Sequence, residues 1–402
     1  MSHLMNTYAR LPVAFVRGEG VFLFDAQGKR YLDAIAGIAV NGLGHAHPRF
    51  TAAIAGQAAR LIHTSNMYRI EEQENLAAEL CRLSGMDKVF FCNSGAEANE
   101  AAIKLARLYG HQRGVDTPTI IVMEKSFHGR TMATLTATGS RKVQAGFEPL
   151  LGGFVRVPYN DVASVAQVAA NNKNIVAVLV EPIQGEGGVR VPQPLPEYLA
   201  GLRELCDRHN WLLMLDEVQC GIARTGVWFA YQHTAIKPDV MTLAKGLGSG
   251  IPIGACLAAA AAADVFKPGN HGSTFGGSPF ACTAAHTTLQ IIADDGLLHH
   301  ARAIGEMIRD GLAAQLAKVA GVNQVRGLGL MIGIELARPC GELVRVALDQ
   351  GLLINVTADS VIRLLPPLVM SRAEAQLLIE RLSHLVKTFL NEAAKPSAAA
   401  AA

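Results

Sequence analysis

The chain has 402 residues, of which 50% are hydrophobic and 17% are charged. This length exceeds the size at which a single hydrophobic core usually stops growing, so we expect more than one domain. The balance of 36 basic and 34 acidic residues, a net charge of +2, excludes a general attraction for nucleic acid or an anionic membrane.

Short extended segments separated by glycines begin the chain. The stretch "GVFLFDAQGKRYLDA" predicts a β-hairpin with strands at 21–25 and 30–33 and a turn at 26–28. From about residue 70 to 290, apolar strands alternate with helices, which is the pattern of an α/β parallel sheet. The clearest strands lie at 88–92, 119–123, 175–180, 211–215 and 240–243.

The remaining segments predict a smaller α+β lobe. After about residue 295 we expect a helix at 298–320, a strand region in "VRGLGLMIGIEL", a second helix, and a strand in "SVIRLLPPL". The alanine-rich run 258–263 predicts a short helix. We therefore divide the chain into an N-terminal segment contributing to the small domain (1–48), a large α/β domain (49–295), a small α+β domain (296–395) and a tail (396–402).

Seven cysteines are scattered singly, with no C-x-x-C pair. A disulfide framework or zinc cluster is therefore not expected, and a reducing cytoplasm fits best. The N-terminus shows no signal pattern, and no apolar run is long enough to span a bilayer. We expect a cytoplasmic protein with no membrane and no nucleic-acid partner.

Ligands of parallel sheets bind beyond the carboxyl ends of the strands. After the first of these strands, residues 93–99 ("NSGAEAN") open a helix with small residues, whose free N–H groups suit a phosphate. An ordinary serine N-cap with a glycine turn is the alternative. After the next strand, "FHGR" at 127–130 suits a planar, anionic ligand, although a surface arginine beside a core phenylalanine would look the same.

Two further strand ends carry charged residues. Asp216 and Glu217 follow an apolar run, and their burial requires a partner such as a protonated pyridine nitrogen or a magnesium ion. A nucleotide hydrolase would also fit, but no G-x-x-x-x-G-K-[ST] motif accompanies them. Lys245 follows another apolar strand, where desolvation would lower its pKa and make the amine nucleophilic. A lysine that merely reaches out to water is the alternative.

A phosphate cradle, an aromatic ring, an acid and a lysine at strand ends are together the parts that pyridoxal phosphate requires. The chain resembles the class III aminotransferases of fold type I from about residue 5 to 390. The most specific motifs are "CNSGAEANEAAIKLAR", "FHGRT", "VEPIQGEGGV", "LDEVQCGIARTG", "LAKGLGSGIPIGA", "HGSTFGGSPFAC" and "IRLLPP". The resemblance implies a large domain with a mostly parallel seven-stranded sheet flanked by helices, a smaller α+β domain, and a homodimer.

The resemblance also assigns roles to single residues. Lys245 would carry the cofactor as a Schiff base and move protons, and Asp216 would keep the pyridine nitrogen protonated. Phe127 would stack on the ring. Further cofactor contacts would come from the Gly95 and Ala96 amides at the phosphate, Gln219 near the phenolic oxygen, the adjoining Glu217 and Val218, and Thr274 of the other subunit.

Substrate contacts are implied at four positions. Arg130 would bind the substrate carboxylate, and Ser273 would also contact substrate. Arg363 lies inside an apolar strand and therefore requires an anion. In the family it binds a carboxylate of glutamate and is neutralised by the equivalent of Glu186 when the other donor enters. A purely structural ion pair is the alternative.

The sequence departs from the family pattern at one position, and three other motifs predict neither a metal nor a nucleotide site. The usual "GGNP" has serine for asparagine at position 278, which puts the loop geometry in doubt rather than cofactor binding. His45 and His47 lack an obvious third ligand, so no metal site is expected. The glycines at 246–250 lack a trailing G-K-[ST], and "RGLGLMIG" does not open a helix, so neither predicts a nucleotide site.

The resemblance is closest to family members that transfer the distal amino group of N-acetylornithine to 2-oxoglutarate, as in arginine biosynthesis. Ile38 favours an acylated donor, because enzymes for free ornithine, aligned from the Gly-His pair, carry a tyrosine there. Succinylornithine, succinyl-diaminopimelate, ornithine and 4-aminobutyrate remain alternative donors. An aminomutase, which uses the same cofactor without an oxo-acid acceptor, is the alternative from another enzyme class.

Overall fold

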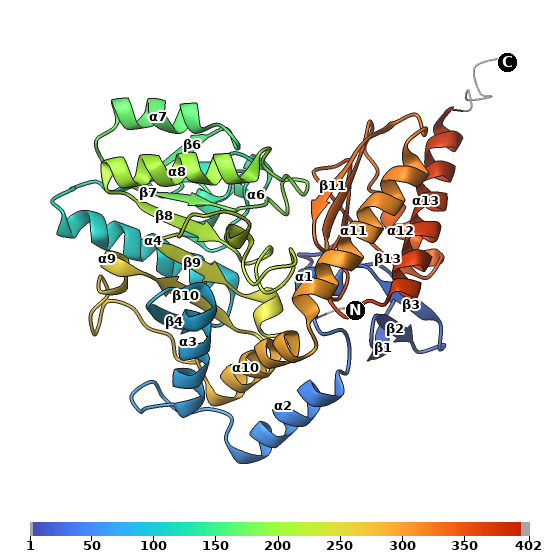
Figure 1. Ribbon diagram of the computed structural model, residues 1–402, viewed down its shortest axis with the longest axis horizontal. Helices are drawn as coiled ribbons and strands as arrows, with labels where there is room; N and C mark the ends of the chain where they lie inside the picture. Colours follow the sequence, from blue (N-terminus) through green and yellow to red (C-terminus); the bar gives the residue numbers. More distant parts are fainter. Residues whose placement is uncertain (1–2, 395–402) are drawn as a thin grey trace.

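A seven-stranded sheet forms the centre of the larger lobe (Figure 1) in the computed structural model, which describes residues 3–394. The predicted tail at 396–402 lies outside the described residues. The strand order is β4-β10-β9-β8-β7-β5-β6, and only β10 runs antiparallel to its neighbours. The strands are β4 (Lys88–Cys92), β5 (Thr119–Met123), β6 (Phe154–Val157), β7 (Ile175–Val180), β8 (Leu212–Asp216), β9 (Val240–Leu243) and β10 (Gly254–Ala258). The predicted, mostly parallel seven-stranded sheet is confirmed.

The central strands are buried on both faces, which explains their continuous apolar sequences. Every residue of β5, β7 and β8 is buried. Alternate residues point to opposite sides: Val122 and Met214 pack with α4 (Gly95–Gln112), whereas Met123 and Leu215 pack with α8 (Leu195–His209). The two helices therefore cover opposite faces of the sheet.

Several predicted boundaries differ from the structure. The strand expected at 211–215 is β8 at Leu212–Asp216, because the Trp211 amide instead closes the end of α8 by donating to the Cys206 carbonyl. Asp216 is thus the last residue of the strand. The helix expected at 258–263 is only α9 (Ala260–Ala263), since Ala258 pairs with Val240 as the end of β10. The sequence analysis predicted neither β6 nor β10.

The C-terminal residues form a separate sheet with the order β11-β12-β15-β14. Its strands are β11 (Val322–Leu328), β12 (Met331–Leu336), β14 (Asn355–Thr357) and β15 (Val361–Leu364), and the flanking helices are α11 (Leu297–Leu316), α12 (Leu343–Asp349) and α13 (Arg372–Ala394). The helix predicted at 298–320 is α11, which ends four residues earlier. These elements form the orange and red lobe in Figure 1.

The predicted N-terminal hairpin is confirmed as β2 (Phe22–Asp25) paired antiparallel with β3 (Arg30–Asp33). β1 (Phe15–Glu19) adds to one edge, and β13 (Leu352–Leu353) pairs in parallel with β3, placing Leu32 opposite Leu352. The hairpin therefore shares a sheet with the C-terminal residues, and it lies beside them in Figure 1.

The remaining short elements connect these layers. They are α1 (Ala36–Ala39), α2 (Pro48–Arg60), α3 (Glu71–Ser84), α5 (Met132–Ala137), α6 (Arg141–Gln144), α7 (Val162–Asn171), α10 (Pro279–Asp294), and the 3₁₀ turns η1 (Ala230–His233) and η2 (Lys245–Leu247). Helix α10 packs against α2, α3 and α11, and so links the two lobes. Between residues 3 and 394, no helix is long and apolar enough to cross a membrane.

Candidate active site

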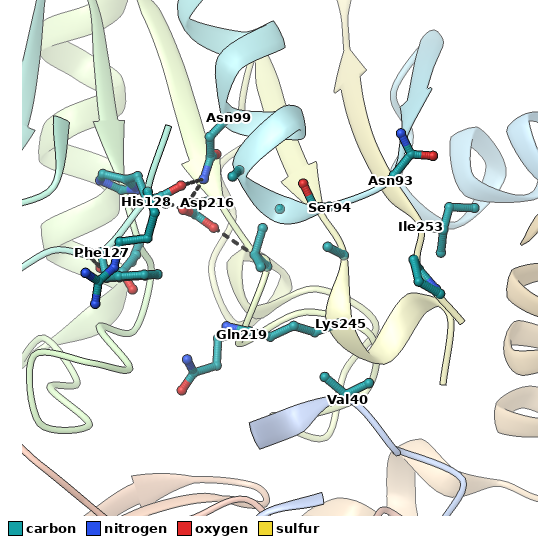
Figure 2. Close-up of a pocket in the computed structure, with 18 of the residues that line it drawn as sticks. Val40, Asn93, Ser94, Asn99, Phe127, His128, Asp216, Gln219, Lys245 and Ile253 are labelled. Carbon is teal, nitrogen blue, oxygen red and sulfur yellow. Dashed lines mark hydrogen bonds and ion pairs between the residues drawn. The ribbon is translucent and has the colours of Figure 1, made fainter. Parts of the chain in front are cut away.

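A cavity of about 460 Å³ opens where β4, β5, β8 and β9 end. Eight of the residues predicted to carry chemistry line it: Gly95, Ala96, Phe127, Arg130, Asp216, Val218, Gln219 and Lys245. Figure 2 shows Lys245, Asp216 and Gln219 facing the same space, with dashed lines joining Asp216 to Asn99 and His128. Segments spread over 150 residues of sequence thus meet at one edge of the sheet, as the rule for parallel sheets requires.

Lys245 enters the cavity from a strained backbone. It follows β9 by two residues, and its φ of 44° lies in the left-handed region that side-chain-bearing residues rarely adopt. Burial lowers the pKa of Lys245, and the negative charge of Asp216 partly opposes that shift. A larger fraction of the amine is therefore neutral than in an ordinary lysine, which makes it a better nucleophile and proton acceptor.

Asp216 is held in one orientation by three hydrogen bonds. Its Oδ2 accepts from Asn99 Nδ2 at 2.8 Å and from the His128 ring Nδ1 at 2.7 Å, while its Oδ1 accepts from the Val218 amide at 3.0 Å. Thr242 Oγ1 in turn donates to Asn99 Oδ1 at 2.7 Å. These hydrogen bonds fix the direction in which the carboxylate faces, so Asp216 is placed to hold a proton on a ring nitrogen.

The start of α4 forms the opposite wall. Ser94 caps the helix by accepting from the Glu97 amide, so the Gly95 and Ala96 amides are left at the first turn, beside the cavity. A Cβ on Gly95 would lie 2.7 Å from Val218 Cγ1, so only glycine allows this close approach. The exposed amides and the helix dipole together suit a phosphate group.

Phe127 and Arg130 lie on the loop that follows β5. The Phe127 amide donates to Glu181 Oε2 at 3.1 Å, which fixes the ring at the cavity wall. The Arg130 guanidinium is exposed and lies 5.7 Å from the centre of the Phe127 ring. Burial raises the pKa of Glu181 well above its ordinary value, and the charge of Asp216 adds to that shift.

Arg363 and Glu186 form an ion pair near this cavity. Arg363, on β15, is 1% exposed, and its Nη1 donates to Glu186 Oε1 at 2.7 Å and to Gln219 Oε1 at 3.2 Å. Asn355 Oδ1 accepts from the other guanidinium nitrogens, at 2.7 and 3.1 Å. The Glu186 side chain is 37% exposed, so the anion of the pair can move whereas the cation cannot.

Residues 4–386 match the model of the family described as aminotransferase class-III. The chain belongs to the class III aminotransferases. It is 62% identical, over 98% of its length and 100% of the relative's, to the acetylornithine aminotransferase of Nitrosomonas europaea. Its fold matches the ornithine aminotransferase of Toxoplasma gondii ME49 with a TM-score of 0.93 and 35% identity, covering 97% of this chain and 94% of that one. An acetylornithine aminotransferase from Elizabethkingia anophelis matches with a TM-score of 0.85 and 37% identity, over 96% and 97% of the two chains.

Class III aminotransferases depend on pyridoxal phosphate, and the cavity fits this cofactor. An amine of lowered pKa, an oriented carboxylate, a helix start with open amides and an aromatic ring all line the same space. The buried Nε2 of His128 has no hydrogen-bond partner among the described residues, while the ring's Nδ1 contacts Asp216.

Five predicted residues of this class III aminotransferase do not line the cavity: Glu186, Arg363, Glu217, Ser273 and Thr274. Gln219, which lines the cavity, connects the Glu186–Arg363 pair to it by accepting a hydrogen bond from Arg363. Ser273 Oγ instead accepts from Asn93 Nδ2 at 3.2 Å, and Asn93 is itself part of the wall. Thr274 is exposed beside it.

Glu217, predicted as a cofactor contact, is not among the residues that line the cavity. Its Oε2 and Oε1 accept from the Ala230 and Tyr231 amides at 2.7 and 2.8 Å. Glu217 therefore caps the start of η1, and burial raises its pKa to about 7. Asp216 therefore lines the cavity, whereas the adjacent Glu217 stabilises the start of η1.

Ser278, which stands where the family's "GGNP" pattern has asparagine, lies at the N-cap of α10. Its side chain caps α10 by accepting from the Ala281 amide at 3.3 Å, and serine and asparagine are both strong N-cap residues. His45, which was set aside as a metal ligand, pairs with Asp33 at 2.9 Å. Within residues 3–394 there is no cluster of three or more potential metal ligands.

Asn99, His128 and Thr242 are the site residues to which the sequence analysis gave no role. Asn99 lies on the α4 face otherwise formed by Ala98, Ala101 and Ala102. A buried polar residue on an alanine face was the available signal, since it requires a hydrogen-bonding partner. Its partner lies 117 residues away in sequence, so the pairing itself could not be inferred.

Proposed function

We propose that this class III aminotransferase transfers the distal amino group of N2-acetyl-L-ornithine to 2-oxoglutarate, giving N-acetyl-L-glutamate 5-semialdehyde and L-glutamate. The observation that carries the proposal is the ion pair between immobile Arg363 and movable Glu186. The reaction places two different donors at one site, and a cation that can be covered or uncovered serves both. The identity to the Nitrosomonas relative supports the donor.

We propose that Lys245 and Asp216 carry the proton transfers. Pyridoxal phosphate supplies an aldehyde that exchanges amino groups and a ring that accepts the electron pair left on the substrate carbon. Lys245 would remove the proton from that carbon and deliver it to the cofactor, which its lowered pKa supports. Asp216, fixed by Asn99 and His128, holds a proton on the ring nitrogen.

We propose that two arginines divide substrate recognition. Arg130 binds the carboxylate of acetylornithine, which its exposure at the cavity supports. Glutamate presents its α-amino group, so its α-carboxylate requires a second cation, and Arg363 supplies it once Glu186 moves aside. When acetylornithine enters, only methylene groups face Arg363, and Glu186 neutralises the buried charge.

Free ornithine is the second candidate donor, favoured by the TM-score of 0.93 to an ornithine aminotransferase. Ile38 favours the acylated donor, because an aliphatic side chain offers no hydrogen bond to an unblocked amino group. It packs on an apolar cluster with Ala39, Ile183 and Val189. The sequence identity to acetylornithine aminotransferases decides between the two in our proposal.

A panel of donors tests the assignment. Acetylornithine, succinylornithine, succinyl-diaminopimelate, ornithine and 4-aminobutyrate are each supplied with 2-oxoglutarate, and glutamate formation is measured. We expect the highest kcat/KM with acetylornithine and ping-pong kinetics with an obligatory oxo-acid. A higher kcat/KM with free ornithine would reject the acylated donor, and turnover without any oxo-acid would instead identify an aminomutase.

We propose that the active enzyme is a homodimer with shared sites. Exposed apolar side chains gather on two touching loops: Met67 and Tyr68, 85% and 69% exposed, and Phe275, 63% exposed. Asn66 joins these loops by donating to the Ser273 and Gly276 carbonyls. Such a patch beside the site suits a second copy of the chain, whose Thr274 then reaches the phosphate. Sedimentation of the holoenzyme, and cofactor affinity of Thr274→Ala, test this.

We propose a cytoplasmic location and the domain division 1–48, 49–295 and 296–395. All seven cysteines are free and six are buried, which suits a reducing compartment. The pairing of β3 with β13 supports assigning the N-terminal segment to the small domain. Localisation of a fluorescent fusion and limited proteolysis near residues 48 and 295 test these two points.

A further inference from the structure

A second cavity, of about 480 Å³, lies between the large lobe and the C-terminal sheet. We call it the interlobe cavity and define it by Lys125, Arg190, Gln324, Arg326, Glu335 and Ser360, which are among the residues that line it. The first two belong to the large lobe and the other four to β11, β12 and the turn before β15. None of them lines the cofactor cavity.

The interlobe cavity carries an excess of positive charge. Lys125, Arg190 and Arg326 face a single lining carboxylate, Glu335, which is already paired with Arg326 Nη1. Arg190 donates to the neutral Gln184 Oε1 at 3.1 Å and lies 5.1 Å from the Tyr159 ring. Within the described part of the chain, the Lys125 ammonium has no ion pair or hydrogen bond, and Arg190 has no carboxylate partner.

Three cations line one polar hollow from two lobes, and two of them, Lys125 and Arg190, have no carboxylate partner within residues 3–394, which suits the binding of an anion. Guanidinium groups offer paired N–H donors to oxyanions, and a lysine adds a compact charge. A phosphate group carries a charge of about −1.5 to −2 at pH 7, which matches the two cations that Glu335 leaves uncompensated. We propose that the interlobe cavity binds a phosphate group, either as inorganic phosphate or as a small phosphomonoester.

The interlobe cavity lies against the loop that carries Glu186. Arg326 donates through Nε to the Val189 carbonyl at 2.9 Å and through Nη2 to the Gly188 carbonyl at 2.6 Å. Gly188 and Val189 belong to the loop that carries Glu186, and Thr357 holds that same loop through the Glu186 carbonyl. The proposed phosphate site thus lies behind the loop of the Glu186–Arg363 pair, and its occupancy does not depend on the proposed donor.

Calorimetric titration of the holoenzyme with inorganic phosphate tests the proposal directly. Bound pyridoxal phosphate fills the active-site cradle, so the added phosphate reports on another site. At constant ionic strength we expect saturable binding of one phosphate per chain. Glycerol 3-phosphate forms the second arm: tighter binding than inorganic phosphate identifies a phosphomonoester as the ligand, and equal or weaker binding identifies the free anion. Absence of saturable binding in both arms overturns the proposal.

Three variants that change one charge each sharpen the result. Lys125→Gln removes an unpaired cation and should weaken phosphate binding about tenfold. Glu335→Gln removes the competing carboxylate and should tighten it by a similar factor. Lys173→Gln changes the same charge at an exposed lysine that does not line the cavity, and should leave the affinity unchanged. Equal weakening by Lys125→Gln and Lys173→Gln, or weakening by Glu335→Gln, would overturn the proposal.

Discussion

Asp216 and Glu217 are adjacent buried acids with different partners, and replacing each by its amide should separate catalysis from stability. Asp216→Asn removes the negative charge of a carboxylate that lines the cavity and is held in place by hydrogen bonds from Asn99 and His128. Glu217→Gln changes a carboxyl group that accepts hydrogen bonds from the Ala230 and Tyr231 amides and from the Cys220 thiol. Both substitutions keep the side-chain volume, so each variant is the control for the other.

The magnitudes follow from these contacts. An asparagine at 216 cannot keep a ring nitrogen protonated, so proton removal by Lys245 should slow roughly 100- to 1000-fold, as when one preorganised electrostatic partner is lost. In Asp216→Asn, the side-chain NH₂ would take the place of Oδ1, which accepts a hydrogen bond from the Val218 amide, so two donors would face each other. In Glu217→Gln the NH₂ faces a backbone N–H in the same way. Each variant should therefore lose about 1–3 kcal/mol of folding free energy from one unsatisfied buried donor.

Single-turnover absorbance of the holoenzyme, recorded with acetylornithine that carries deuterium at its amino-bearing distal carbon, measures the proton step. In Asp216→Asn we expect a slow step with an increased isotope effect, and in Glu217→Gln a rate near that of the wild type. Urea unfolding measures the stability of both. A crippled Glu217→Gln beside a mild Asp216→Asn would refute our assignment of the two acids.

Four further predictions follow from the site. Lys245→Ala should abolish turnover yet still bind pyridoxal phosphate, and borohydride reduction of the wild type followed by peptide mapping should label Lys245 and no other lysine. Arg130→Lys should raise the KM for acetylornithine about tenfold or more by losing the bidentate fork, but leave a donor without a carboxylate much less affected; equal effects would contradict carboxylate binding. Glu186→Ala should slow the acetylornithine half-reaction and leave the glutamate half-reaction steady or faster, because Arg363 is then permanently free; equal slowing in single-turnover spectra would make the pair structural. Because burial raises the pKa of Glu217 from 4.5 to about 7, the folded chain retains a proton that the unfolded chain releases, so wild-type stability relative to Glu217→Gln should fall by about 3 kcal/mol from pH 4.5 to 7, as urea unfolding across that range can show.

Sequence predicted those parts of the fold whose residues are buried on both sides. Strands β5, β7 and β9 were predicted at their observed bounds because continuous apolar runs are typical of central parallel strands. β10 escaped prediction because its sequence, "GACLA", is rich in small residues with weak strand preference. Its burial between β4 and β9 is a tertiary effect that no local pattern encodes.

In the site too, residues marked by a local sequence pattern were predicted, whereas residues whose roles depend on long-range contacts were not. Lys245 and Asp216 were predicted because charged residues directly after apolar strands are unusual and because the motifs around them resemble one family, and both line the cavity. Asn99 and His128 were missed, since their roles consist only of contacts with Asp216 across 117 and 88 residues of sequence. Glu217 was predicted as a cofactor contact because two neighbouring acids at a strand end look alike in sequence, whereas the fold turns its side chain toward η1.

The pairing of β3 with β13 has a consequence for biosynthesis. Leu32 finds its partner Leu352 only after about 320 further residues have left the ribosome, which takes roughly 20–60 seconds at 5–20 residues per second. Throughout that time the nascent hairpin presents an unpaired strand edge, the kind of surface that pairs wrongly with other chains. Translation products that stop before β13 therefore leave that edge open permanently, which makes them a preferred source of aggregates and a natural substrate for chaperones.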